Sequence, residues 1–364
     1  MCQEFRIDAQ GRTRMNGSAE RARSASLQDV ARRAGVSGQT VSRVANNSER
    51  VADATRHRVL AAMNELGYRP NVAARALRRG AFGSIGVVVF SLDSLGNIGT
   101  IGGILTAAAA RGYAIELIQA QPALTAGDAV ASAVSRLDQD AVDGIIVVIE
   151  SHLMSSASVG FPAGMPSVLI QSGAGDEHPS VTADQDQGSR LAVEHLLSLG
   201  HETVWHIAGP PASRAAELRR RAWQSTLEAA GRAVPHVHVG DWTAESGYRI
   251  GRLLAAQPEL TALFAANDQM ALGAMRAFHE RGRAVPAEVS VVGFDDMAEA
   301  AYFWPPLTTV RQDFGTAGSL AVSLVVDQIE GRPVAGGVHH VSTALVTRAS
   351  TAPHPRCPTK DDRS

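Results

Sequence analysis

The residues near the N-terminus best suited to chemistry are polar side chains that alternate with the apolar Val41 and Val44: Gln39, Thr40, Ser42 and Arg43. Gln and Arg carry donor and acceptor pairs that match the major-groove edges of adenine and guanine, and Ser and Thr hydroxyls suit phosphates or either base. This set predicts a DNA-reading helix face. An ordinary capped helical hairpin is the simpler alternative.

A second group of polar residues lies after Val/Ile-rich segments: Arg219, Asn267, Asp268, Asp295 and Asp296. In open α/β sheets a ligand lies beyond the carboxyl ends of the strands, so these positions favour a binding site. Carboxylate, guanidinium and amide groups can hold sugar hydroxyls, while Trp242 is a candidate to cover the sugar's CH face. A core tryptophan and post-strand helix caps are the structural alternatives.

The elements that must position the first group form a small helical unit. Ser26 is a predicted N-cap with Asp29 three positions on, Gly35 suits a tight turn, and Ser37 caps the second helix. A third helix, with apolar residues at helical spacing, ends at Gly67. Residues 26–68 therefore predict a helix-turn-helix headpiece, in which one helix braces and the next enters the major groove.

The second group depends on a different pattern, in which short Val/Ile-rich runs alternate with helical stretches. The runs are residues 85–90, 114–118, 144–149, 166–170, 203–209, 262–267 and 289–295. That rhythm predicts parallel sheets covered by helices on both faces, with too many strands for one small sheet. The predicted fold class is therefore α/β with a small all-α headpiece.

Charge separates the two regions. Residues 24–80 hold ten arginines against four acids, a net charge of +6, whereas the whole chain of 364 residues is −2 and the remainder is therefore −8. This asymmetry is typical of a phosphate-contacting module joined to a domain with another task. A solvated charged face explains isolated arginines, but it explains their segregation less well.

Composition sets further bounds. An apolar content of 45% supports a sizeable core, no run of about 18 apolar residues predicts a membrane span, and the first residues lack a signal peptide's apolar segment. Cys2 and Cys357 lie in polar tails, which indicates neither a disulfide framework nor a zinc site. We expect a cytoplasmic protein with disordered tails at 1–25 and 352–364, and the sequence leaves open whether Met1 or Met15 is the start.

Several motifs give a resemblance to a known family. The segments VSGQTVSRVANN, GYRPNVAARAL, AGPPASRAAELRRRAW, FAANDQMALGAMRA, VSVVGFDDM and PPLTTVRQDF resemble the lactose repressor (LacI) family of bacterial transcription regulators, over roughly residues 26–350. The resemblance implies a hinge helix and linker at 69–83 and a sugar-binding and dimerisation core at 84–351. It implies an N-lobe of about 84–183 and 315–340 and a C-lobe of about 184–312 and 341–351. The implied chain crossings lie near 183–185, 312–314 and 339–341.

The resemblance also implies site residues. Those for DNA are Ser26, Leu27, Ser37, Gln39, Thr40, Ser42, Arg43, Asn46, Asn71, Ala74 and Leu77, with Leu77 of each protomer wedging into the minor groove. Those for a sugar are Ser91, Gln171, Arg219, Trp242, Asn267, Asp295, Gln312 and Phe314. Gln171 stands where the resembled pattern has an aspartate, Val148 where it has an asparagine, and Gly38 where it has a large aromatic, so the 6-position contacts of the sugar and the operator sequence stay open.

The resulting hypothesis is a sugar-responsive repressor that binds a pseudo-palindromic operator as a homodimer and leaves it when a galactoside-like inducer binds. A regulator activated by a sugar corepressor, a free-standing sugar-binding module and a sugar-modifying enzyme are the alternatives. The tail 350–364 carries no apolar heptads, which favours a dimer over a tetramer.

We expect no cofactor and no metal. The glycines at 96, 99 and 102 have GxxGxxG spacing rather than a nucleotide-loop pattern. The paired carboxylates of Asp295 and Asp296, and the pairs His236 with His238 and His339 with His340, lack a third ligand at a recognisable spacing.

Overall fold

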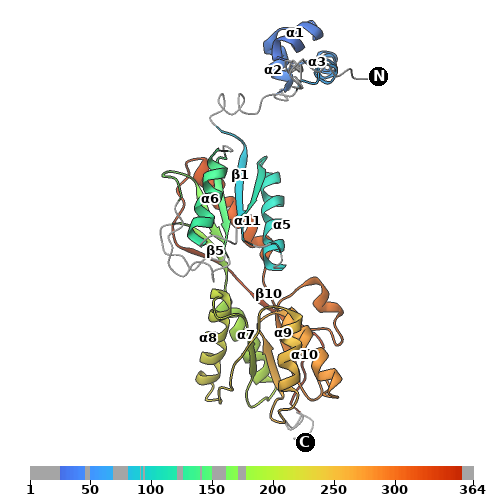
Figure 1. Ribbon diagram of the computed structural model, residues 1–364, viewed down its shortest axis with the longest axis vertical. Helices are drawn as coiled ribbons and strands as arrows, with labels where there is room; N and C mark the ends of the chain where they lie inside the picture. Colours follow the sequence, from blue (N-terminus) through green and yellow to red (C-terminus); the bar gives the residue numbers. More distant parts are fainter. Residues whose placement is uncertain are drawn as a thin grey trace, which may run out of the picture. The chain divides into compact units, whose positions relative to one another are not determined.

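The computed structural model describes residues 25–45, 50–68, 81–90, 92, 95–120, 126–139, 142–149, 161–170 and 178–354. The chain divides into two compact units, residues 1–81 and 82–364, each of which is described by itself (Figure 1). Among the described residues, no helix combines the length and the apolarity that crossing a membrane requires.

Within its described residues, the first unit contains three short helices around one apolar core. These are α1 (Leu27–Ala34), α2 (Gly38–Ala45) and α3 (Asp53–Glu65). Val30, Val41 and Val59 are fully buried at their junction. Gly35 follows α1 at φ 64°, a left-handed conformation that costs glycine little, and so turns the chain into α2.

The second unit contains two six-stranded sheets. The first, with strand order β11-β5-β4-β3-β1-β2, is fully parallel; the second, with order β12-β10-β9-β8-β6-β7, is parallel except that β12 pairs antiparallel with β10. We call each sheet with its covering helices a lobe. The predicted combination of an all-α headpiece and two α/β lobes is confirmed, with β12 as the one antiparallel addition.

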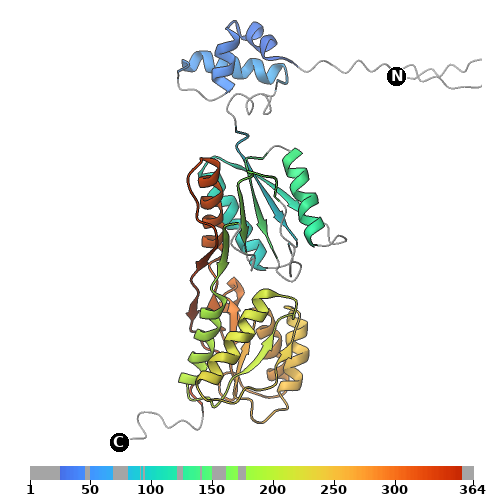
Figure 2. The same ribbon diagram turned by 90° about the vertical axis from the view of Figure 1, so that its left-hand side faces the viewer.

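The first lobe has apolar helices on both faces of its sheet. Its strands are β1 (Ser84–Val89), β2 (Ala114–Gln119), β3 (Gly144–Val148), β4 (Ser167–Ile170), β5 (Ser180–Ala183) and β11 (Val338–Val341). Helices α5 (Leu95–Ala110) and α11 (Phe314–Ile329) cover one face and α6 (Ala126–Gln139) covers the other (Figure 2). Gly86, Val87 and Val88 show why the strand reads as a continuous apolar run, since both faces are buried.

The second lobe repeats this arrangement. Its strands are β6 (Trp205–Ala208), β7 (His238–Val239), β8 (Ala262–Ala265), β9 (Ser290–Asp295), β10 (Thr308–Arg311) and β12 (Ala344–Val346). Helices α9 (Ala244–Leu254) and α10 (Asp268–Glu280) pack on one face, and α7 (Gln185–Ser198) and α8 (Arg214–Ala229) pack on the other. A 3-10 helix, η2 (Ala298–Tyr302), follows β9.

Three connections join the lobes, after Ala183, Arg311 and Val341. Val341, which the sequence analysis placed in the C-lobe, is instead the last residue of β11 in the first sheet, where it pairs with Ala183. Strands β5, β7, β10, β11 and β12 were not among the predicted runs, because each has only two to four residues and all but β12 contain polar residues.

Candidate functional site

The headpiece presents its candidate DNA contacts in two ways. Gln39 and Arg43 are exposed on α2, whereas Thr40 and Ser42 are half-buried. Ser37 caps α2, because its Oγ accepts the amide of Thr40 at 3.2 Å and lies 3.0 Å from the Thr40 hydroxyl. Among the DNA candidates on α2, Gln39 and Arg43 are therefore the ones that the structure leaves exposed.

The start of α1 is built as the sequence predicts. Ser26 and Asp29 form a reciprocal capping box, in which the Ser26 amide donates to the Asp29 carboxylate at 2.9 Å. Leu27 packs against α2, where a Cβ at Gly38 would lie 3.1 Å from its Cδ2. Gly38 therefore permits close packing of α1 on α2.

Part of the expected DNA and sugar sets lies outside the described residues: Asn46, Asn71, Ala74, Leu77, Ser91 and Gln171.

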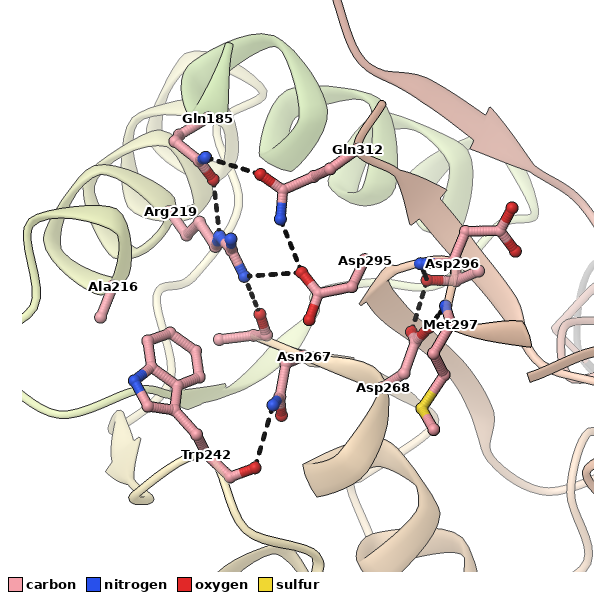
Figure 3. Close-up of polar contacts among 12 residues, drawn as sticks. Gln185, Ala216, Arg219, Trp242, Asn267, Asp268, Asp295, Asp296, Met297 and Gln312 are labelled. Atoms are coloured by element: carbon pink, nitrogen blue, oxygen red, sulfur yellow. Dashed lines mark hydrogen bonds and ion pairs between the residues drawn. The ribbon is translucent and has the colours of Figure 1, made fainter. Parts of the chain in front are cut away.

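The described sugar candidates of the second lobe gather where its central strands end (Figure 3). Asn267 follows β8, Asp295 ends β9 and Gln312 follows β10, three strands that are neighbours in the sheet. Arg219, from α8, reaches this edge and contacts Asp295. The carboxyl ends of parallel strands thus bring Asn267, Asp295 and Gln312 together, and α8 adds Arg219 to the same edge.

Four side chains form a closed polar ring. The Nε of Arg219 donates to Gln185 at 2.7 Å, and the amide of Gln185 donates to Gln312 at 2.9 Å. Gln312 in turn donates to Oδ1 of Asp295 at 2.6 Å, and the Arg219 Nη1 lies 3.6 Å from the same oxygen (Figure 3). Each member fixes the orientation of the next.

Gln185 was missed by the sequence analysis. It is the first residue of α7, directly after the first connection between the lobes, and it is buried. Its position after a strand end was the available signal, but the motif that carried the resemblance did not include it.

Arg219 is held in an apolar as well as a polar environment. It is 5% exposed, its guanidinium carbon lies 3.8 Å from the ring centre of Phe294 and 5.5 Å from that of Trp242, and its Nη1 donates to the carbonyl of Ala266. Burial lowers the pKa of Arg219, and Asp295 opposes this shift. Burial raises the pKa of Asp295 to about 6, against the lowering effects of Arg219 and Gln312.

Trp242 and Asn267 are coupled to each other. Asn267 is the N-cap of α10, accepting the Met270 amide at 2.9 Å, and its Nδ2 donates to the Trp242 carbonyl at 2.9 Å. The Trp242 ring packs on Gly209, where a Cβ would be 2.3 Å away. Both residues therefore have structural roles besides any contact with a ligand.

Backbone strain is concentrated here. Among the described residues, the non-glycine residues with positive φ are Trp242 at 74°, Asp295 at 115° and Asp296 at 56°. Such conformations cost about 1–3 kcal/mol each and are retained where the surroundings over-determine them, most often at functional sites.

Asp296 is bound by two arginines. Its carboxylate binds Arg311 at 2.6 Å and Arg348 at 2.5 Å, which anchors the turn to β10 and to the segment after β12. The part of the chain that the structure describes contains no group of three His, Cys, Asp or Glu residues able to hold a metal.

Phe314 begins α11 in the first lobe and lies against Gly99 of α5, where a Cβ would be 3.1 Å from its own. Gly103 and Gly318 likewise allow the backbones of α5 and α11 to approach closely. Of the glycines with GxxGxxG spacing, Gly99 is therefore a helix-packing position, whereas a Cβ at Gly102 would meet nothing within 4 Å. His236 and His238 pack edge to face near the edge strand β7, and His339 and His340 lie in the edge strand β11.

Two protein-family models match parts of the chain. Residues 26–71 match the model of bacterial regulatory proteins, lacI family, and residues 193–351 match a periplasmic binding protein-like domain. The chain is 35% identical to the lactose operon repressor of Escherichia coli (strain K12), covering 89% of this chain and 90% of that one. It is 31% identical to the repressor PurR of Pasteurella multocida (strain Pm70), covering 90% and 98%.

Solved structures indicate the same family. The lac repressor dimer bound to operator and the anti-inducer ONPF superposes with a TM-score of 0.78 at 34% identity, covering 91% of this chain and 100% of that one. The transcriptional regulator CelR in complex with cellobiose has a TM-score of 0.66 at 31% identity, covering 90% and 99%.

Proposed function

This chain belongs to the LacI family of bacterial regulatory proteins, and we propose that it represses transcription from a pseudo-palindromic operator until a small sugar binds its second unit. It is a DNA-binding transcriptional regulator with a ligand-binding core, and its relatives are repressors rather than enzymes. The proposed division is a headpiece at 26–68, a hinge at 69–83 and a core from 84. Because operator DNA is the target, the proposed compartment is the cytoplasm.

One observation supports a sugar as the effector. In the polar ring, Oδ1 of Asp295 is already engaged by Gln312 and Arg219. Within the described residues, no hydrogen bond reaches Oδ2 of Asp295 or leaves Nη2 of Arg219. A fixed acceptor beside a fixed donor is the arrangement that neighbouring hydroxyl groups of a sugar can satisfy, because each hydroxyl both donates and accepts.

Two solved relatives favour the same class of ligand. One solved relative holds cellobiose, and another is the lac repressor bound to ONPG. With Arg219, Asp295 and Gln312 joined in one polar ring and Trp242 nearby, a galactoside-like sugar is the first candidate. Other glycosides come next.

The proposed DNA-reading residues are those of α2. Gln39 and Arg43 are exposed on α2. The side chain of Ser37 caps the start of this helix, and we propose that its exposed face enters the major groove. The cationic balance of residues 24–80 supplies the phosphate attraction, which releases counterions and makes binding steeply dependent on salt.

A homodimer fits both the operator symmetry and the surface of the second lobe. Trp304 and Tyr302 are 94% and 88% exposed, although large aromatic side chains are usually buried or in interfaces. One solved relative is a dimer on its operator. We therefore place the segment around η2 in contact with a second copy.

The test measures how tightly the protein binds operator DNA and whether a sugar releases it. Labelled promoter fragments are titrated with the full chain by fluorescence anisotropy, and a panel of mono- and disaccharides is screened by thermal shift, because a ligand that binds only the folded state raises the melting temperature. We expect nanomolar operator binding that a sugar weakens. Sugar that strengthens operator binding would identify a corepressed regulator, sugar binding with no DNA binding would identify a free-standing module, and conversion of the sugar would identify an enzyme.

A further inference from the structure

A second carboxylate lies behind Asp295. Asp268 is the first residue of α10 and is 1% exposed. Its Oδ2 accepts the amide of Met297 at 2.9 Å, and its Oδ1 accepts the hydroxyl of Thr309 at 2.5 Å (Figure 3). The site motifs identified Asp268 only as a post-strand residue, and the function proposed above does not use it.

These two hydrogen bonds hold the strained turn from two sides. Asp295 and Asp296 both have positive φ, and Met297 is the next residue, so the bond to Met297 fixes the end of the strained segment. The Thr309 hydroxyl also accepts the Asp296 amide at 3.4 Å. Gly293, on the strand that leads into the turn, leaves the room that Asp268 needs, since a Cβ there would lie 2.2 Å from its Oδ1. Asp268 therefore determines where the turn places the Asp295 carboxylate.

The charges around this pair do not balance when both carboxylates are ionised. Arg219 is the cation facing Asp295 and Asp268, whereas Arg311 and Arg348 are bound to Asp296. Within the described residues, no cation makes an ion pair with Asp268. Burying a second negative charge against one guanidinium is costly, so the group relieves the cost by keeping a proton.

The titration directions agree with this balance. Burial, and then the charge of Asp295, raise the pKa of Asp268 to about 8, while its bonds from Thr309 and Met297 act in the opposite direction. Burial raises the pKa of Asp295 to about 6. Near neutral pH the pair therefore carries one proton, which resides on Oδ1 of Asp268, and the hydrogen bond to the Thr309 oxygen then runs from Asp268 to Thr309.

We infer that Asp268 is a positioning residue of the effector site and that the site binds its sugar in the form in which Asp268 is protonated. The inference rests on the proposed function, because it concerns the same ring of residues. A bound sugar excludes water from Asp295 and Arg219, which raises the cost of a second negative charge beside them. Between the titrations of Asp295 and Asp268, effector affinity is thus constant, and above the titration of Asp268 it falls toward tenfold per pH unit, since one proton is taken up on binding.

The first arm of the test needs no effector. Full-length protein labelled with 15N-methionine contains eight methionines, and Met297→Leu identifies the amide of Met297, which donates directly to Asp268. We expect this amide to titrate with a midpoint near pH 8. The titration persists in Asp186→Asn, an exposed aspartate in the same lobe, and disappears in Asp268→Asn.

The second arm uses the sugar with the largest thermal shift in the panel, measured by calorimetry between pH 6.5 and 9. The wild type loses affinity above pH 8, whereas Asp268→Asn, which resembles the neutral acid, binds with a dissociation constant independent of pH. Asp268→Ala, which removes the bond to Met297, binds more weakly at every pH.

The two arms separate the two hypotheses. A Met297 amide that does not titrate between pH 6.5 and 9 in the wild type overturns the proton assignment, even if Asp268→Asn fails to fold. Affinity of the wild type that stays flat with pH overturns the coupling. If no sugar binds, the proposed effector class is wrong, while the amide titration still decides the state of Asp268.

Discussion

The side-chain amide of Asn267 donates to the carbonyl oxygen of Trp242 over 2.9 Å, and so the cap of α10 also fixes the strained backbone of the proposed sugar platform. Two residues that the sequence suggested as separate ligand contacts therefore constrain each other's positions. The coupling explains how a tryptophan with φ 74° is held in place, and it leads to the first prediction.

Asn267→Ser should keep the cap, because a hydroxyl still accepts the Met270 amide, but it removes the side-chain amide that donates to Trp242. We expect unfolding free energy to fall by about 1 kcal/mol, the value typical of one hydrogen bond, and effector affinity to fall about fivefold. Asn267→Ala removes the cap as well and should cost about 1 kcal/mol more. Urea unfolding and sugar titration measure the two effects. Unchanged sugar affinity in Asn267→Ser would show that the tether does not matter for binding.

Arg219→Ala should destabilise the protein in a pH-dependent way, because it leaves the buried carboxylate of Asp295 without its cation. Removing one partner of a buried ion pair typically costs about 3–5 kcal/mol. The pKa of Asp295, which burial raises to about 6, rises further without Arg219, so the carboxyl is neutral at pH 5 and the loss is smaller there than at pH 8.

The matched control is Arg220→Ala, which breaks a half-exposed pair with Glu217 and should cost ~0–1 kcal/mol. Urea unfolding of both variants at pH 5 and pH 8 makes the comparison. An equal loss at both pH values for Arg219→Ala would contradict the role of Asp295.

His201 should make the second lobe sensitive to acid. Its two ring nitrogens lie 3.1 Å from the hydroxyls of Thr261 and Ser290, and burial, followed by His354, lowers its pKa to about 4. A histidine with a depressed folded-state pKa stabilises the protein fully above the unfolded pKa near 6.5, and this stability is lost as pH falls from 6.5 to about 4. The loss amounts to about 3 kcal/mol for one group.

His201→Gln should reduce the slope of unfolding free energy between pH 4 and 6.5, whereas the exposed His340→Gln should leave it unchanged. Burial shifts the pKa of His206 in the same direction, to about 3, so part of the slope persists in His201→Gln. A slope identical to wild type would assign the acid sensitivity elsewhere.

Gln39→Ala and Arg43→Ala should each weaken binding to the cognate operator by about 1–3 kcal/mol, the usual value of one good base contact, and should relax specificity at one base pair. Arg33→Ala is the matched control, because Arg33 is an exposed headpiece cation that binds Glu65 at 2.8 Å. Anisotropy titrations on cognate and scrambled duplexes separate the effects. Uniform weakening on both duplexes would mean that the two residues contact phosphates only.

Trp304→Ser should shift the protein from dimer to monomer and weaken operator binding, because a 94% exposed tryptophan is best explained as an interface anchor. Val239→Ser, an exposed apolar residue on the edge strand β7, should leave the assembly intact. Sedimentation velocity gives the answer. A stable wild-type tetramer would contradict the expectation drawn from the C-terminal segment.

Much of the architecture was already determined by the sequence, because helix and strand signals are local. The capping box of Ser26 and Asp29, the turn at Gly35 and the apolar runs of β1, β3 and β9 each depend on residues within a few positions. The family motifs also located Arg219, Asp295 and Gln312, although the sequence contained no information on how their atoms pair.

Only the tertiary structure decided the pairing. Gln185 and Gln312 are 127 positions apart, yet their amides form a hydrogen bond because both follow connections between the lobes. Asp268 lies behind Asp295 because β8 and β9 are adjacent and parallel, which brings the start of α10 under the turn that ends β9. Which polar atoms meet, and which are left for a ligand, depends on strand order and register, and these are properties of the whole fold rather than of any segment.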